Sequence, residues 1–494
     1  MGTRVKKKEA PVTFGEQLVL FRYFLHILGI DSGVFKKNSL SGLPEDFKEA
    51  EGLDENQNSN FYRWLAWKAE IMKCQIPVDR LRIYDENIIR HTRQIAERRG
   101  GLKWKYFQYL SLLFTEIYLD RYFSDRKAFV EELNAFLDKI TAESFFRINI
   151  PHFTEDGLNK LAFMCATGSG KTLLMHVNIL QFMHYMKRAK HQNNHLEINK
   201  IIVLAPNENL SSQHLEELKL SNISATLFHK EDTINLHQAD VLVIDMNKLK
   251  EEGKVKTVSV DQFEQNNLVL VDEGHRGMSG NVWYDYRTRL SANGFAFEYS
   301  ATFKQALKAG KATEERKLME EYGRSIIMDY SYKFFYDDGY GKDYRIYNLR
   351  SGIDDEARQI YLVGCLLSFY QQLKVFQEDK TDFTPYMVER PLLVYVGNRV
   401  TASTTEAELT DVEEVVAFLD QFLRNKPKSI ARIKRDPMTQ GWWMAMAMNS
   451  FQLYSSRCTI YSAQQHWMQR PSTWIFSGLF SILPQRQTSR VSRL

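Results

Sequence analysis

The sequence predicts an α/β protein built around a parallel β-sheet. From residue 161 onward, short apolar runs alternate with polar or helical segments. Within each run the apolar residues are continuous, which is typical of strands buried on both faces of a sheet. Helical segments between the runs indicate a doubly wound arrangement. The predicted strands are LAFMC, IIVLAP, VLVID, LVLVD and FAFEYSA.

Composition bounds the class of protein. A chain of 494 residues is too long for one hydrophobic core, so several domains are expected. No apolar stretch is long enough to span a membrane, and the N-terminus lacks a secretory signal, so we expect a cytoplasmic protein. The four cysteines lie far apart, which argues against a disulfide framework or a zinc site. The net charge of +4 is too small to indicate nucleic-acid binding by itself.

The N-terminal part of the chain is predicted to be helical. Residues 1–100 form a helical N-terminal region in this interpretation, and helical spacing of apolar residues continues to about residue 140. The runs FGEQLVLFRYFLHILGI and YLSLLFTEIYLDRYF are expected to be buried helices. The polar segment GLPEDFKEAEGLDENQNSN between them is expected to be a loop.

The strongest motif is LAFMCATGSGKT, a buried strand that leads into a glycine-rich loop and a helix. The glycines allow backbone N–H groups to surround phosphate oxygens, and the helix N-terminus adds partial positive charge. Lys171 is expected to reach the β- and γ-phosphates of ATP, and the Thr172 hydroxyl to bind Mg²⁺. The usual first glycine of the motif is replaced by Cys165. The predicted cofactor-binding loop comprises Thr167, Gly168, Ser169, Gly170, Lys171 and Thr172.

A second motif, LVLVDEGH, places two carboxylates at the end of a buried strand. Ligands of open α/β sheets bind at the carboxyl ends of strands. We expect Asp272 to hold Mg²⁺ through water and Glu273 to polarise the attacking water as a general base. His275 is placed to connect nucleotide state to other motifs.

A third motif follows in FAFEYSAT, where a predicted strand ends at Ser300-Ala301-Thr302. Hydroxyl groups at a strand end can hydrogen-bond the acidic motif, so Ser300 and Thr302 are predicted to couple the site to the rest of the motor. GSGKT, DEGH and SAT in this order resemble the first RecA-like domain of superfamily 2 helicases and translocases. That resemblance implies a RecA-like P-loop domain over residues 101–305, followed by a second RecA-like domain.

Softer matches extend the resemblance. IIVLAPNENL is similar to a motif that touches the nucleic-acid backbone, which would make Pro206 and Asn207 nucleic-acid contacts. Gln108 is a candidate for the glutamine that recognises adenine, or an ordinary polar residue of a helix. The long helical N-terminus, DEGHRG, FEYSATF and the connector DYSYKFFYDDGYGKDY resemble the Res (helicase/ATPase) subunit of type III restriction enzymes and relatives.

The C-terminal part departs from that family. Residues 306–345 are expected to be a connector, and residues 346–436 a partial second RecA-like domain. Its predicted elements are a helix near 355–376, the strand RPLLVYVG and a helix over 411–423. The Q/H-x-x-G-R-x-x-R element, whose arginines complete the ATP site, does not occur, nor does a nuclease cluster after 345. The chain therefore resembles a motor truncated after the start of its second domain.

Residues 437–494 have an unusual composition. They contain no Asp, Glu or Lys, and they hold four of the eight tryptophans of the chain. Two interpretations remain open: a segment read in a shifted frame, which is not native sequence, or an acid-poor tail.

Three functions are consistent with the sequence. The first is an ATP-dependent translocase or helicase subunit of a restriction or defence system, acting on duplex DNA through non-specific backbone contacts. The second is an RNA helicase of the same superfamily, because the motifs alone do not separate DNA from RNA. The third is a truncated remnant that binds ATP without turnover. A modification methyltransferase partner is implied by the family resemblance alone.

Overall fold

The computed structural model describes two compact units, residues 1–344 and 345–494. The described residues are 13–34, 39–143, 148–191, 196–228, 241–249, 260–275, 281–307, 312–341, 355–384, 388–396, 411–427 and 429–430. Nothing in the described part is a helix long and apolar enough to cross a membrane. Residues 437–494, with the unusual composition noted above, lie outside the described residues.

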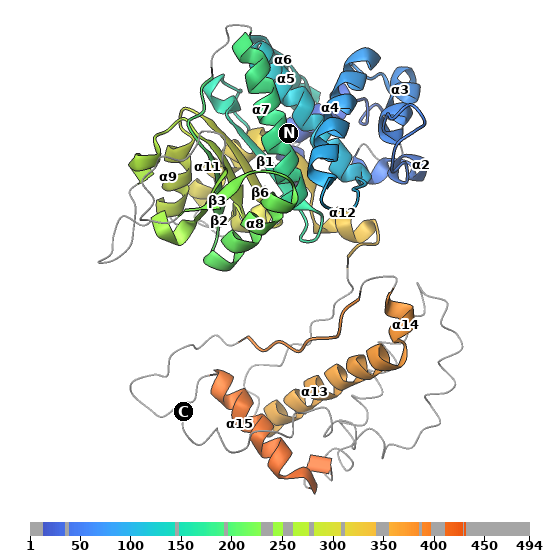
Figure 1. Cartoon of the computed structure of the whole chain (residues 1–494), viewed down its shortest axis with the longest axis vertical. Helices are drawn as coiled ribbons and strands as arrows, with labels where there is room; N and C mark the ends of the chain where they lie inside the picture. The colour runs from blue at the N-terminus through green and yellow to red at the C-terminus, as the bar shows by residue number, and fades with distance from the viewer. Residues whose placement is uncertain are drawn as a thin grey trace, which may run out of the picture. The chain divides into compact units, whose positions relative to one another are not determined.

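The first unit contains a seven-stranded sheet in which every pairing is parallel (Figure 1). The strand order is β3-β4-β2-β5-β6-β1-β7, so the chain crosses over between most strands. This topology confirms the predicted α/β fold of the RecA-like type, and all five predicted strands are present. The strands are β1 (Lys160–Cys165), β2 (Ile201–Ala205), β3 (Ala225–Leu227), β4 (Val241–Asp245), β5 (Leu268–Asp272), β6 (Phe295–Ser300) and β7 (Ile326–Tyr330).

Both faces of the sheet are covered, as the continuous apolar runs predicted. In β5, Leu268 and Leu270 belong to the large core cluster, whereas Val269 and Val271 belong to a second cluster on the other face. Alternate residues of one strand therefore enter separate cores. The second cluster includes Tyr286 and other residues of α9 (Asn281–Leu290).

The N-terminal helices form one core with the sheet rather than a separate domain. A single cluster of buried side chains runs from Leu18 to Tyr330. Helices α4 and α5 lie beside α7 in Figure 1. The predicted helical region is thus present, and its helices continue beyond residue 100. The helices are α1 (Val19–Ile27), α2 (Glu45–Lys48), α3 (Asn60–Met72), α4 (Val78–Ala96), α5 (Tyr106–Ser124), α6 (Arg126–Glu143), α7 (Lys171–His191) and α8 (Glu208–Leu220).

The segment expected to be a connector is part of the first unit. It forms most of the run from α10 (Phe303–Leu307) through α11 (Ala312–Ser325) and β7 to α12 (Tyr332–Asp337). β7 pairs with β1 at one edge of the sheet, and all five of its residues are buried. The connector prediction for 306–345 is therefore wrong over these elements, because the run IIMDY pairs with β1 and its residues are buried in the core.

The second unit is helical in its described part. It contains α13 (Asp355–Glu378), α14 (Lys380–Phe383) and α15 (Asp411–Arg424), and the two long helices agree with prediction. The expected strand RPLLVYVG is wrong over residues 390–396, which form no strand. Leu392 is 82% exposed and Val396 is 89% exposed. A strand needs a paired neighbour for its backbone groups, and no described strand of this unit supplies one.

Candidate functional site

The glycine-rich loop connects the end of β1 to the first residue of α7. Gly168 and Gly170 have φ angles of +85° and +88°, a region that favours glycine. The Ser169 N–H donates to the Ala166 carbonyl at 3.1 Å, which closes the turn. The loop therefore lies at the N-terminus of a 21-residue helix, the arrangement that binds phosphate groups.

Cys165, which stands where the motif usually has glycine, is a buried core residue. Burial raises the pKa of its thiol to about 12, although the positive charge of Lys171 acts in the opposite direction. The thiol is therefore neutral and fills space behind the loop. The departure from the motif leaves the turn at Gly168 and Gly170 intact.

Gln108 lies against the glycine-rich loop. Its Nε2 donates to the Ser169 carbonyl at 2.8 Å, and its Oε1 accepts from the Lys105 N–H at 2.9 Å. A Cβ added at Gly170 would lie 2.5 Å from Nε2 of Gln108. Both ends of the amide are occupied by protein in this arrangement. Adenine recognition by Gln108 stays a prediction, and the observed contacts are with the loop.

The turn Asp272-Glu273-Gly274 at the end of β5, which we call the acidic loop, lies at the same edge of the sheet as the glycine-rich loop. Lys171 Nζ is 3.3 Å from Glu273 Oε1, so two of the predicted catalytic residues form an ion pair. Glu273 has a φ of +52°, a strained conformation for a residue with a side chain. Such strain is concentrated at functional sites, where the surrounding structure enforces it.

Asp272 is held in place by two hydrogen bonds. One oxygen lies 3.0 Å from His214 Nε2, and the other accepts from the Glu273 N–H at 2.9 Å. Burial raises the pKa of Asp272, but His214 and Lys171 outweigh burial and leave it below its ordinary value. Asp272 is therefore a carboxylate at neutral pH.

Sequence reasoning missed His214, which lies on α8. Its side chain is buried, and so are those of Ser211 and Leu218 on the same helix. Residues three and four apart share one helix face, so a polar pair on the buried face was a usable signal. The link to Asp272 spans 58 residues of sequence, and no local pattern reveals it.

The third motif is connected to the second by His275. Its Nδ1 lies 2.8 Å from Ser300 Oγ and 3.2 Å from Glu273 Oε2. The Thr302 N–H donates to the same Ser300 hydroxyl at 3.0 Å. Lys171, Glu273, His275 and Ser300 thus form a continuous series of contacts, which we call the edge set. The structure thus brings Lys171, Glu273, His275 and Ser300 into contact, and the roles assigned to them stay predictions.

The predicted nucleic-acid contacts lie at the start of α8. Pro206 is buried, and its carbonyl accepts from Asn247 Nδ2 at 3.2 Å. The Asn207 side chain caps α8 by accepting from the Leu210 N–H at 3.0 Å. Asn207 is partly exposed beside this helix N-terminus, whereas the Pro206 ring offers little surface to a ligand. Their role as nucleic-acid contacts stays a prediction.

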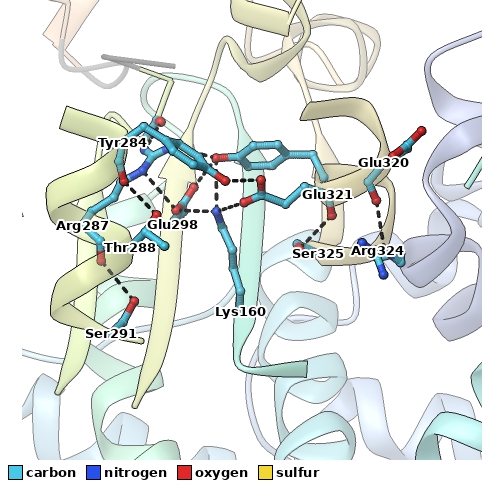
Figure 2. A network of polar contacts seen from close by, with 12 residues as sticks. Lys160, Tyr284, Arg287, Thr288, Ser291, Glu298, Glu320, Glu321, Arg324 and Ser325 are labelled. Atoms are coloured by element: carbon cyan, nitrogen blue, oxygen red, sulfur yellow. Dashed lines mark hydrogen bonds and ion pairs between the residues drawn. The ribbon is translucent and has the colours of Figure 1, made fainter. Parts of the chain in front are cut away.

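A second charged group of residues connects β1, β6, α9 and α11 (Figure 2). Lys160 of β1 pairs with Glu298 of β6 at 2.8 Å and with Glu321 of α11. Arg287 of α9 donates to the Gly274 carbonyl and, at 3.0 Å, to Tyr322. We call Lys160, Arg287, Glu298, Glu321 and Tyr322 the interior network.

The interior network keeps its charges. Burial lowers the pKa of Lys160, but Glu298 and Glu321 outweigh it and hold that pKa above its usual value. Burial raises the pKa of Glu321, but Lys160 and the hydrogen bonds to that carboxylate leave it below its usual value. Because Arg287 holds the Gly274 carbonyl, this network supports the acidic loop from behind.

The residues present fit a nucleotide with Mg²⁺. Within the described residues no group of three or more His, Cys, Asp or Glu side chains could hold a metal by itself. Mg²⁺ is commonly bound by one or two protein oxygens together with substrate phosphates. Thr172 in the first turn of α7 and the ionised Asp272 supply such oxygens, and the left-handed glycines supply the phosphate cradle.

A known protein family matches part of the first unit. Residues 124–305 match the family model described as "Type III restriction enzyme, res subunit". No curated protein matches the sequence.

Three solved structures show a limited similarity to parts of this chain. The Sulfolobus solfataricus SWI2/SNF2 ATPase core in complex with dsDNA is 15% identical, with a TM-score of 0.24 over 33% of this chain and 31% of that chain. The T4 UvsW structure is 14% identical, with a TM-score of 0.24 over 45% and 44% of the two chains. The Pyrococcus furiosus Hef helicase domain is 14% identical, with a TM-score of 0.27 over 65% and 66%.

The chain therefore spans between about a third and two thirds of the length of these solved chains. The parallel sheet, the three motifs at one edge of it and the family match point to one class. Residues 124–305, which include strands β1 to β6, are therefore similar to the res subunit of type III restriction enzymes.

Proposed function

We propose that this chain is an ATP-dependent translocase or helicase subunit of a restriction or defence system, acting on duplex DNA. One observation carries the proposal: the edge set links the phosphate loop to the end of β6 through direct contacts. A motor needs such a link, because the nucleotide state must alter groups outside the nucleotide site.

ATP binding would change the contact between Lys171 and Glu273 in the edge set. The loop amides and Lys171 bind the β- and γ-phosphates, and Thr172 and Asp272 hold Mg²⁺. When bound, Mg²⁺ neutralises charge that develops on the phosphates. Lys171 then exchanges Glu273 for phosphate, since the ion pair between them is 3.3 Å long and partly exposed. Glu273 is released to orient and deprotonate the attacking water.

Release of Glu273 would alter the position of His275. His275 contacts both Glu273 and Ser300, so a move of the carboxylate changes the hydrogen bond at the end of β6. Ser300 also accepts from the Thr302 N–H, immediately before α10. In this proposal, hydrolysis alters the chain that leaves the sheet, and repeated cycles step the protein along a phosphate backbone.

Two further functions are tested alongside the first. An RNA helicase of the same superfamily would use the same site on RNA. A chain that binds ATP without turnover is favoured by the missing arginine element, because such arginines contribute about 10³-fold or more to phosphoryl transfer. A methyltransferase subunit remains the proposed partner on the basis of the family match.

ATP hydrolysis by the full chain tests the proposal. We expect turnover that rises on addition of duplex DNA and exceeds the turnover with single-stranded DNA or RNA. Lys171→Ala should lower it by about 10²-fold or more. Lys187→Ala, an exposed lysine of the same helix, is the matched control and should leave turnover unchanged. Stimulation by RNA alone would favour the RNA helicase, and ATP binding without turnover would favour the remnant.

A further inference from the structure

The segment after β7 forms a tight turn beside the phosphate loop. Gly339 has a φ of +83°, and the N–H groups of Tyr340 and Gly341 donate to the Phe335 carbonyl at 3.1 and 3.2 Å. A Cβ at Gly341 would lie 2.8 Å from the Tyr336 backbone. The sequence DDGYG thus folds back onto α12 and fixes the position of Tyr340.

Asp338 anchors this turn to the body of the first unit. Its carboxylate accepts from Lys48 at 3.0 Å, from Tyr330 at 2.7 Å and from Tyr106. Tyr330 in turn stacks on Phe107 of α5, with ring centroids 3.6 Å apart and planes within 6°. The turn is therefore held against the helix that carries Gln108.

Aromatic rings of the turn lie next to the loop that is predicted to bind phosphate. Phe335 Cζ is 3.8 Å from the position that a Cβ of Gly168 would occupy. The Tyr340 ring lies 5.6 Å from that of Phe335 and 6.2 Å from that of Phe107. Gln108, the neighbour of Phe107, contacts the same loop at Ser169. Helices α12 and α5, which are far apart in the sequence, thus both lie next to the glycine-rich loop.

The rings of this turn remain open to solvent. Tyr340 is 42% exposed, and Phe335, whose ring lies near Gly168, is only half-buried. Lys105 Nζ lies 5.7 Å from the centre of the Tyr340 ring. Exposed rings beside a loop of this kind resemble the sites at which proteins stack nucleobases.

We propose that Tyr340, supported by Phe335, stacks on the purine base of the nucleotide whose phosphates lie in the loop Gly168–Thr172. This inference rests on the proposed ATP-binding function and assigns the site of the base. Because Gly168 has no side chain, nothing at this position of the loop separates it from the ring of Phe335. Stacking favours purines over pyrimidines, because purines present the larger aromatic face.

Equilibrium binding of two ligands tests the inference. ATP and inorganic tripolyphosphate, each with Mg²⁺, are titrated into the full chain by calorimetry. Tyr340→Ala should weaken ATP about tenfold and leave tripolyphosphate within about twofold, since loss of an aromatic stack typically weakens base binding by about fivefold or more. Tyr340→Phe keeps the ring and should recover most of the ATP affinity. Trp67→Ala, which removes a 69% exposed ring of α3, should change neither ligand.

The outcomes separate this inference from the proposed function. Lys171→Ala should weaken both ligands, because both carry the phosphates. Unchanged ATP affinity in Tyr340→Ala, or an equal loss for both ligands, overturns the base site while leaving ATP binding in place. Failure of the unmodified chain to bind either ligand overturns the ATP-binding function and the base site together.

Discussion

The edge set and the interior network are built from the same kinds of charged side chain, yet their surroundings differ. In the edge set, one lysine faces one carboxylate at 3.3 Å, and Glu273 is 26% exposed. In the interior network, Glu298 is 2% exposed and is paired with both Lys160 and Arg287. Both groups include a contact to the acidic loop: Lys171 of the edge set pairs with Glu273, and Arg287 of the interior network donates to the Gly274 carbonyl.

The difference indicates which charged side chains can exchange an ion-pair partner for a ligand and which cannot. A partly exposed pair contributes little to stability, so a phosphate can replace one partner at small cost. A buried pair that loses one partner leaves an uncompensated charge in the interior, which is strongly destabilising. We infer that the interior network fixes the acidic loop while the edge set responds to nucleotide.

The largest expected effect is on stability, in the interior network. Arg287→Ala should lower the free energy of unfolding of the first unit by about 3–5 kcal/mol, because Glu298 loses a buried partner and the Gly274 carbonyl loses its donor. Denaturant unfolding followed by circular dichroism measures the loss.

The same helix offers a control for that prediction. Arg289 is 31% exposed and pairs with the exposed Asp285 at 3.6 Å. Arg289→Ala should therefore cost less than about 1 kcal/mol. Equal losses for the two arginines would mean that burial does not distinguish the interior network from a surface pair.

A second prediction concerns the pH dependence of stability and another buried ionisable group, His176. His176 of α7 is fully buried, and burial, with His214 and Arg99 nearby, lowers its pKa to about 3. The unfolded chain binds a proton at this histidine below about pH 6.5, but the folded chain does not until about pH 3. Stability should therefore fall with decreasing pH over this window, by up to about 1.4 kcal/mol per unit.

Unfolding at pH 7.5 and pH 5 measures that slope. The loss between the two pH values should be smaller in His176→Gln than in the unmodified chain by about 2 kcal/mol. At the edge, the pKa of Asp272 is below its ordinary value, so its contribution persists until the pH falls below about 4. An unchanged slope in His176→Gln would show that this histidine is protonated in the folded chain.

The sequence predicted the edge of the sheet better than its interior. Motif residues such as Lys171, Asp272 and Ser300 follow apolar runs directly, and parallel strands bring their carboxyl ends to one edge. His214 and Arg287 were missed because their partners are distant in sequence and depend on tertiary packing.

Strand formation in the C-terminal half of the chain also depends on tertiary partners that the sequence does not reveal. The runs IIMDY and LLVYV are both apolar, yet only the first is a strand, because β1 is available as its neighbour. The charged and aromatic composition of its surroundings, with the turn signals of DDGYGKDY, led to the connector prediction. An apolar run indicates a strand only where the fold provides a partner, and the sequence of the run does not contain that information.

The smallest expected effect concerns backbone strain at Glu273. A residue with a side chain at positive φ costs about 1–2 kcal/mol, and glycine relieves this strain. Glycine also adds about 0.5–1 kcal/mol of chain entropy to the unfolded state. Glu273→Gly should therefore be more stable than Glu273→Gln by about 0.5–1 kcal/mol, although both variants lose the ion pairs to Lys171 and His275 and both lose turnover.

Denaturant unfolding of the two variants isolates the strain, because the lost charge is common to both. Greater stability of Glu273→Gln would mean that the loop holds this conformation without cost. Greater stability of Glu273→Gly would mean that the strain lies at the residue whose carboxylate we propose to move when phosphate pairs with Lys171. The Arg287 hydrogen bond to the neighbouring Gly274 carbonyl then explains how the strained conformation persists, since the interior network holds the loop while the edge set is free to exchange partners.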